Sequence, residues 1–328
     1  MQTLHEAPRR HSLACLALAL LLWLLPRPEC ACAQSIWFSP RGGRERPADY
    51  MDLFQPNAPW REAASHVKVF EISQPMSAAG PETELRQIAE DLQRRHIALC
   101  VGLLPLSAGP DGCGKGIEGY SAPGQSLHDA QRLKSLGIDV AYFGLDEPLY
   151  FGHEFNGTKK LTPCHAPIAE IAQEVARRVK QVHSVYPAAR VGDVEPFPVS
   201  DSWLGELEEW FDAFEAAAGE KLAFFRLDIG WDRPWKQAIP ALTGLLRRKG
   251  IPLQVIYNGS GRAASDEEWI AQALAHAREF EAAGGPVPEV VSIQCWTAKP
   301  SHVLPETDPS SLTSLVNQYV NSRRKKNR

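Results

Sequence analysis

The sequence has almost no net charge. Its 35 Lys and Arg residues against 39 Asp and Glu residues leave a formal charge of −4 at pH 7. Nucleic-acid-binding domains carry a basic face or stripe, so this balance excludes nucleic acid as an expected partner. The short basic end Arg323–Arg328 is typical of a solvated terminus rather than a binding arm.

Spacings that bind metals or cofactors are also scarce. There is no CxxC pair, and His128, His153, His165 and His302 are scattered without ligand spacing. Gly114–Gly119 matches the GxGxxG spacing, but it lies past the third strand and no helix opens after it, which favours a loop over a dinucleotide site. We therefore expect neither a metal nor a cofactor.

Long apolar runs are confined to the N-terminus. Arg9-Arg10 precedes the short apolar stretch Leu13–Leu25, and Ala31-Cys32-Ala33 supplies a small-x-small cleavage pattern. Residues 1–33 thus read as a signal peptide, with an uncleaved anchor as the alternative. We expect a secreted or periplasmic protein that has no membrane contact once residues 1–33 are removed.

Four cysteines follow the signal. Cys100 and Cys295 lie in apolar strand-like runs, which predicts buried thiols. Cys113 and Cys164 lie in loops rich in Gly and Pro, and export makes a disulfide possible. We expect Cys113 and Cys164 to pair.

Strand and helix patterns alternate along residues 34–328. The expected strands are Ile36–Ser39, Val67–Ser73, Ile97–Leu104, Val140–Leu145, Arg190–Val194, Leu222–Ile229, Leu253–Tyr257 and Val290–Trp296. Expected helices include Glu82–Arg95, Ile168–Val185, Leu204–Ala218, Ile239–Lys249, Ser265–Ala283 and Ser310–Val320. Eight such units in roughly 295 residues predict a single-domain (β/α)8 TIM barrel. The main alternative is a doubly wound open sheet. Such a sheet usually has a glycine-rich phosphate-binding turn after its first strand, and this chain matches that turn only weakly at the corresponding place.

Two glutamates share one local pattern. Glu147 and Glu195 each follow an apolar run and precede a proline, which cannot continue a central ladder. Each carboxylate is therefore expected at the carboxyl end of a strand, where barrel enzymes carry their chemistry. Alternation along the strands adds further side chains to the mouth, namely Glu71, Asp193, Asp228, Asn258 and Trp296. Asp146 faces away from Glu147 unless the strand has already turned.

Some of these charges have a structural explanation as well. Alternation also directs Arg226 into the barrel, where it can neutralise Asp228 or Glu195. For Glu71, an internal ion pair is favoured over catalysis. Aromatic residues follow several strands, and Trp231, Tyr257 and Trp296 are candidates to stack on a sugar ring.

At this point the chain resembles the superfamily of secreted (β/α)8 glycoside hydrolases. The segments that carry the resemblance are Phe143–Pro148, Asp193–Pro196 and Gln294–Thr297. It implies an acid/base glutamate before proline at the end of the fourth strand, a tryptophan under the sugar at the end of the eighth, and a monomer acting on a poly- or oligosaccharide. The adjacent acids Asp146 and Glu147 are similar to those of the chitinase-like members, in which catalysis is assisted by the substrate itself.

One departure matters for the second carboxylate. The large retaining clan in this superfamily has a nucleophile at the end of the seventh strand, where this chain reads Ile256–Gly259 with no acid. We therefore assign Glu147 as the general acid/base and Glu195 as its partner, with Asp228 in reserve. The alternative is a non-catalytic carbohydrate-binding barrel that has lost its acid pair.

The signal-peptide interpretation predicts the N-terminus of the exported protein. Edman sequencing of protein recovered from the periplasm or the medium should begin at Gln34, because cleavage follows the last small residue of Ala31-Cys32-Ala33. A membrane-bound product that still begins at Met1 would support the anchor instead.

Overall fold

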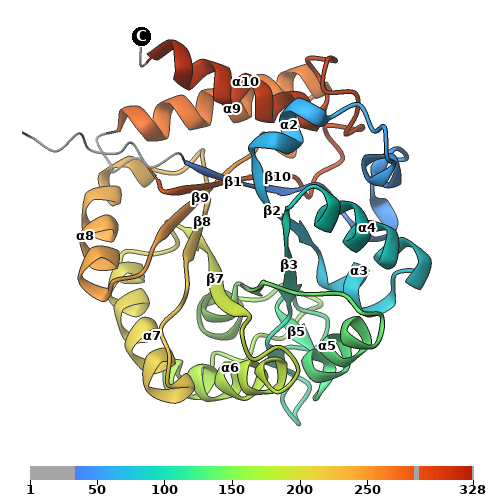
Figure 1. The fold of residues 1–328 in the computed structure, drawn as a ribbon. Coiled ribbons are helices and arrows are strands. Elements are labelled where there is room, and N and C mark those ends of the chain that lie inside the picture. The colour runs from blue at the N-terminus through green and yellow to red at the C-terminus, as the bar shows by residue number, and fades with distance from the viewer. Residues whose placement is uncertain (1–33, 284–287, 327–328) are drawn as a thin grey trace, which may run out of the picture. The chain divides into compact units, whose positions relative to one another are not determined.

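The computed structural model describes residues 34–283 and 288–326, and their centre is a closed barrel of eight parallel strands (Figure 1). Around the barrel the strand order is β1-β10-β9-β8-β7-β6-β3-β2. The strands are β1 (Ser35–Ser39), β2 (Val67–Ile72), β3 (Ala98–Leu103), β6 (Tyr142–Asp146), β7 (Arg190–Phe197), β8 (Phe225–Ile229), β9 (Leu253–Tyr257) and β10 (Val290–Gln294). The predicted TIM barrel is confirmed; the proposed signal peptide lies outside the described residues.

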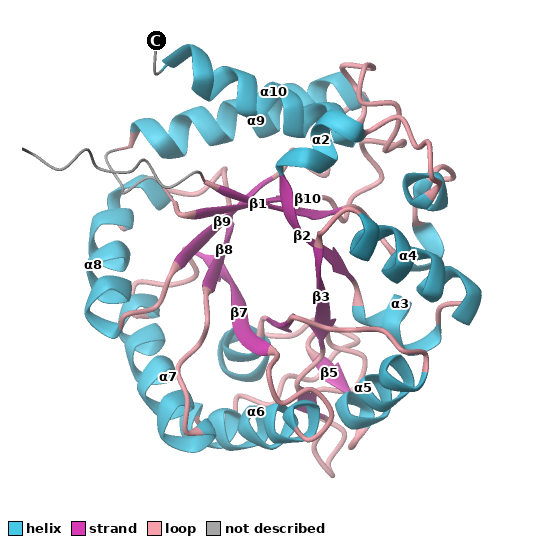
Figure 2. Ribbon diagram, viewed as in Figure 1, coloured by secondary structure: helices cyan, strands magenta, loops and turns pink. Residues whose placement is uncertain are grey.

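Helices form a ring outside the strands (Figure 2). They are α2 (Arg61–His66), α3 (Gln74–Ala79), α4 (Glu82–Arg94), α5 (Gln125–Ser135), α6 (Ile168–His183), α7 (Trp203–Ala218), α8 (Ile239–Lys249), α9 (Asp266–Ala282) and α10 (Leu312–Lys326). The long helices match the predicted ranges closely, whereas the shorter α2, α3 and α5 were not predicted. Within the described ranges, no helix is both long and apolar enough to cross a bilayer.

Side chains that alternate along each strand divide the core into two parts. The outward faces, such as Phe143 and Leu145 on β6, pack with the helices in the large hydrophobic core. A second, smaller hydrophobic cluster fills the interior of the barrel and is formed by Trp37, Val69, Cys100 and Phe224. The interior is therefore a packed layer and not a channel, as expected for eight strands.

A buried charged layer lies against this interior cluster. The guanidinium of Arg226 lies 4.9 Å from the centre of the Trp37 ring and pairs with Glu71 at 2.6 Å. Arg226 also donates to the side chains of Gln254 and Gln294, at 3.0 and 3.4 Å. The internal ion pair expected for Glu71 is thus present, and its cation is Arg226.

The structure corrects the expected end of β7. This strand continues through Glu195 and Pro196 to Phe197, with Pro196 opposite Asp228 of β8. The proline is tolerated because the pairing of β7 with β6 has already ended at Val194, so one side of the ladder is free there. Val194 faces the pocket, whereas Asp193 and Glu195 share the outer face of β7 with Val191 and Phe197, which pack in the large hydrophobic core.

The predicted disulfide is confirmed. Cys113 and Cys164 are bonded, with 5.0 Å between their Cα atoms, and join the loops that follow β3 and β6. Cys100 and Cys295 are buried free thiols, also as predicted.

The Arg226 layer generates a stability prediction. Arg226→Ala should lower the free energy of unfolding by about 3–5 kcal/mol, because it leaves the buried Glu71 carboxylate without its partner. Urea unfolding measures the change, with the exposed Arg247→Ala as a control expected to stay within about 0.5 kcal/mol of the parent. An equal, small effect of both substitutions would contradict a structural role for the pair.

Candidate active site

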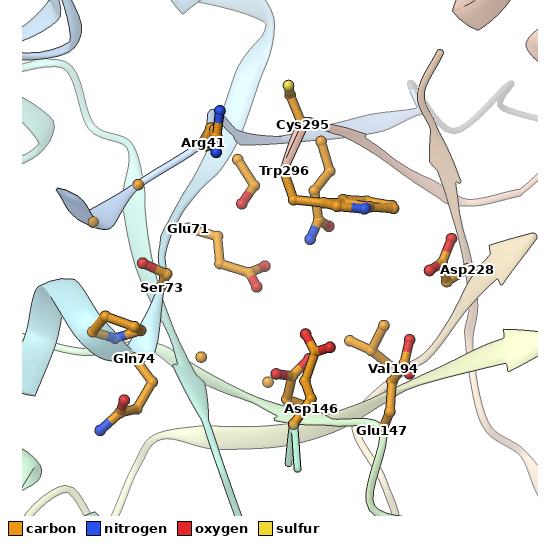
Figure 3. Close-up of a pocket in the computed structure, with 18 of the residues that line it drawn as sticks. Arg41, Glu71, Ser73, Gln74, Asp146, Glu147, Val194, Asp228, Cys295 and Trp296 are labelled. Carbon is orange, nitrogen blue, oxygen red and sulfur yellow. The ribbon is translucent and has the colours of Figure 1, made fainter. Parts of the chain in front are cut away.

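A pocket of about 800 Å³ opens at the carboxyl ends of the strands (Figure 3). This is the end of the barrel at which TIM-barrel enzymes carry out their chemistry, and the volume suits a ligand of several sugar-sized groups. The acidic side chains of its lining are Glu45, Glu71, Glu118, Asp146, Glu147 and Asp228. Two glycines also line the pocket: Gly144 on β6, where an added Cβ would lie 3.7 Å from the Glu71 carboxylate, and Gly102 on β3, beside the backbone of Ile72–Gln74.

Glu147 reaches this pocket through an unusual backbone. Strand alternation would direct its side chain outward, with Phe143 and Leu145. Its φ of 48° is in the left-handed region, which non-glycine residues adopt at a cost of roughly 1–2 kcal/mol. The left-handed turn ends the strand, and Glu147 lines the pocket beside Asp146. Backbone strain of this kind concentrates at functional sites.

Glu195 lies behind Glu147 and not in the pocket lining. Its carboxylate accepts hydrogen bonds from the backbone N–H groups of Leu149 and Tyr150, at 2.6 and 3.0 Å. These residues lead into a π-helical turn, Tyr150–Glu154, that directly follows Glu147 and Pro148. Glu195 therefore anchors the segment that carries Glu147, a positioning contact that the sequence pattern did not suggest.

Asp193 is likewise placed away from the pocket. It is fully buried, and its carboxylate accepts a hydrogen bond of 2.7 Å from Nε1 of Trp210 on α7. Burial raises the pKa of both Asp193 and Glu195 well above the ordinary range, and repulsion from Asp193 adds to the shift at Glu195. Asp193 therefore links β7 to α7, and Glu195 links β7 to the segment that follows Glu147.

The pocket acids titrate unusually high because they are buried near one another. Burial raises the pKa of Asp146 to about 8, with repulsion from Glu118 and Glu71 as the next causes. It raises the pKa of Asp228 to about 7, helped by Glu118. The pKa of Glu147 is also raised well above its usual value, first by burial and then by the charge of Asp228.

Glu147 and Asp228 oppose each other's ionisation, because the repulsion between two carboxylates acts on both. Burial raises the pKa of both groups as well. Two buried acids that resist ionising together can supply one protonated carboxyl and one carboxylate, the division of roles that acid-base catalysis needs.

Trp296 is the aromatic residue that the structure brings to the pocket. Its side chain follows β10, lines the cavity and is 45% exposed. In Figure 3 it lies across the pocket from Asp146, with Asp228 beside it. An exposed indole at a pocket mouth presents a flat apolar face to a ligand.

The other predicted binding residues lie outside the pocket lining. Trp231 donates a hydrogen bond of 2.7 Å to Asn258 and stacks on His276 with 4.3 Å between ring centres. Tyr257 is on the outer face of β9 and packs against Tyr319 of α10, because its neighbour Ile256 takes the inward position. The structure thus places these three predicted binding residues outside the pocket lining, where they join the barrel to its surrounding helices.

Sequence reasoning missed Glu118, whose carboxyl lines the pocket. It lies in Gly114–Gly119, the segment interpreted as a flexible loop. Gly119 has a φ of 79°, and an added Cβ would lie 3.0 Å from the carbonyl oxygen of Asp146, so this loop approaches β6 closely. Arg41 also lines the pocket from the loop after β1, and Gln74 does so from the first position of α3. No periodic signal marks these three residues, because loop positions and the ends of short helices follow no repeating face.

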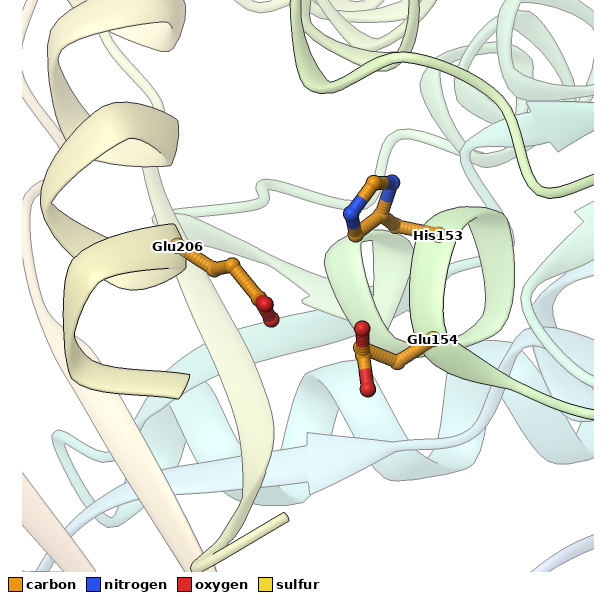
Figure 4. A group of neighbouring side chains, drawn as sticks. All are labelled: His153, Glu154 and Glu206. Atoms are coloured by element: carbon orange, nitrogen blue, oxygen red, sulfur yellow. The ribbon is translucent and has the colours of Figure 1, made fainter. Parts of the chain in front are cut away.

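Metal-binding geometry occurs outside the pocket. Among the described residues, the one group of His, Cys, Asp and Glu side chains whose ligand atoms converge is His153, Glu154 and Glu206 (Figure 4). The pocket acids do not form such a group within the same described ranges.

The raised pKa of Asp228 predicts how stability changes with pH. The folded state holds this proton up to about pH 7, whereas the unfolded chain loses it near pH 4, so the group destabilises the fold increasingly between these values. Asp228→Asn should therefore raise the free energy of unfolding at pH 8 by on the order of 2–4 kcal/mol and change it little at pH 4. Urea titrations at both pH values test this, with the exposed Asp232→Asn as control. The same gain at both pH values would contradict the argument.

No family model and no curated protein matches the chain. Its fold is similar to solved (β/α)8 structures at very low sequence identity. Xylanase 10B from Thermotoga maritima aligns with a TM-score of 0.54 at 7% identity, covering 89% of this chain and 96% of that one. A GH10 structure from Paenibacillus barcinonensis gives a TM-score of 0.52 at 10% identity, over 88% and 95% of the two chains. An endo-1,4-beta-xylanase from Caldicellulosiruptor owensensis gives a TM-score of 0.51 at 8% identity, covering 84% of this chain and 88% of that one. The chain has the same TIM-barrel fold as these enzymes.

Proposed function

We propose that this protein is a secreted or periplasmic, monomeric glycosidase that hydrolyses a poly- or oligosaccharide. One observation carries the proposal: a left-handed Glu147 at the end of β6 shares a pocket with Asp228, and burial raises the pKa of both carboxyls. Two of the fold neighbours are xylanases, which agrees with a carbohydrate substrate; similarity at this identity concerns the fold. The disulfide agrees with an exported protein.

In the proposed reaction, Glu147 is the general acid. Burial favours the protonated form of its carboxyl, which donates the proton to the glycosidic oxygen as the bond to the sugar breaks. The ionised Asp228 stabilises the positive charge that develops on the sugar ring and acts either as nucleophile or as base for a water molecule. Proton NMR of the first product distinguishes these two roles, since a nucleophile retains the anomeric configuration and a base inverts it.

The neighbouring groups support this division. Glu195 holds the turn after Glu147 through two backbone hydrogen bonds and so fixes where the acid stands. Trp296 offers its exposed face for stacking on a sugar ring. In this assignment the partner of Glu147 is Asp228, the residue first held in reserve, because Glu195 is occupied behind the pocket.

The second candidate function is a barrel that binds carbohydrate without cleaving it. It is favoured by the burial of Glu195, which removes one of the two partners available to Glu147. This protein would use the same pocket and Trp296 but would leave glycosidic bonds intact. Binding to a polysaccharide panel without release of reducing ends would support it.

Replacing Glu147 by Gln keeps the shape of the side chain and removes its proton. Turnover of a substrate found by screening polysaccharides should fall by roughly 10²–10⁴-fold, with folding preserved. Reducing-sugar release measures the change, and Glu170→Gln, an exposed position on α6, is the matched control. Cleavage by Glu147→Gln at the parent rate would exclude Glu147 as the acid.

Trp296→Ala should mainly weaken substrate binding, by roughly tenfold, because it removes the stacking face and leaves both carboxyls. Trp231→Phe changes an aromatic residue outside the pocket and should leave KM unchanged. Steady-state kinetics separate the two cases. A larger change in KM from Trp231→Phe than from Trp296→Ala would show that the sugar platform is misassigned.

A further inference from the structure

Three potential metal ligands converge on the outer side of the segment that carries Glu147. His153 and Glu154 belong to the π-helical turn Tyr150–Glu154, and Glu206 belongs to the first turns of α7. Their ligand atoms all lie within 4.8 Å of one another. Figure 4 shows the three side chains pointing toward a common space between the turn and the helix.

The histidine is arranged as a metal-binding histidine would be. Its Nδ1 lies 2.8 Å from the carbonyl oxygen of Ala166 and can only donate there, which leaves Nε2 with a free lone pair. A hydrogen bond from one ring nitrogen to a backbone carbonyl is the usual way in which proteins orient a metal-binding imidazole. This contact is independent of the two glutamates.

The two glutamates lack the partners that would otherwise explain their proximity. Within the described ranges, neither Glu154 nor Glu206 forms an ion pair, and Oε2 of Glu206 is buried without a hydrogen-bond partner. An acid in the first turns of a helix is favoured by the helix dipole, but that does not account for a buried, unpaired oxygen or for a second carboxylate beside it. A cation between them would satisfy both.

We propose that His153, Glu154 and Glu206 bind a divalent transition-metal ion of the zinc class. One imidazole nitrogen with two carboxylate oxygens is a donor set that suits Zn²⁺, while Mg²⁺ and Ca²⁺ prefer oxygen ligands alone. Donor atoms around tetrahedral zinc lie about 3.4 Å apart, so small rotations of the glutamate side chains complete the site. Water occupies the fourth position.

The site has a structural role in this proposal. Glu195 holds one end of the π-helical turn from the barrel side, and the metal ion holds the other end against α7. The segment after Glu147 is thereby fixed at two points. The proposal does not depend on the glycosidase function, because it concerns metal binding and stability.

The test uses the full, untagged protein after dialysis against EDTA and reloading with Zn²⁺. We expect one zinc per chain by elemental analysis and a rise in Tm of about 3 °C or more at saturation. Glu206→Gln preserves shape and should weaken zinc binding at least tenfold, as should His153→Ala. The controls are Glu209→Gln, an exposed acid on the same helix, and His128→Ala, an exposed histidine, and both should bind like the parent.

Circular dichroism checks that each variant is folded. If His153→Ala does not fold, Glu206→Gln still tests the proposal. Absence of zinc binding by the parent overturns the proposal. So does equal binding by Glu206→Gln and Glu209→Gln, and so does a rise in Tm with Ca²⁺ that Zn²⁺ does not produce.

Discussion

The guanidinium of Arg226 provides the positive charge at the centre of the barrel. It lies over the rings of Trp37 and Phe224 and holds Glu71 at the base of the pocket. Its charge also lowers the pKa of Asp146, against the burial and repulsion that raise it. Without this cation, no buried positive charge would lie beneath the carboxyls of the mouth, and a buried charge without compensation destabilises a fold. The acidic pocket depends on this one ion pair beneath it.

Above that layer, repulsion among the pocket acids raises their pKa values. Each ionised carboxyl raises the pKa of its neighbours. Burial and the charges of Asp228 and Asp146 all favour the protonated form of Glu147. Ionisation of these buried acids lowers the stability of the fold, because their pKa values are raised in the folded state.

Regular strands were predictable from sequence, and so were the side chains they direct inward. Arg226 and Asp228 were placed correctly because β8 alternates without interruption. Prediction failed where local geometry departs from that period. Asp193 and Glu195 lie on the outer face of β7 with Val191 and Phe197, opposite to the face assigned to them, and Glu147 enters the pocket only through its left-handed backbone. Glu118 could not be found because a loop position is fixed by tertiary contacts that no short pattern records.

The bond between Cys113 and Cys164 ties the loop that carries Glu118 to the loop that follows Glu147. Glu118 in turn contributes to the raised pKa of Asp146 and Asp228. The acidity of the pocket is therefore linked to the redox state of two distant cysteines. In a reducing compartment the chain would lack this tie, and the wall bearing Glu118 would be held by weaker contacts such as the hydrogen bond from the backbone N–H of Gly114 to the carbonyl of Thr162.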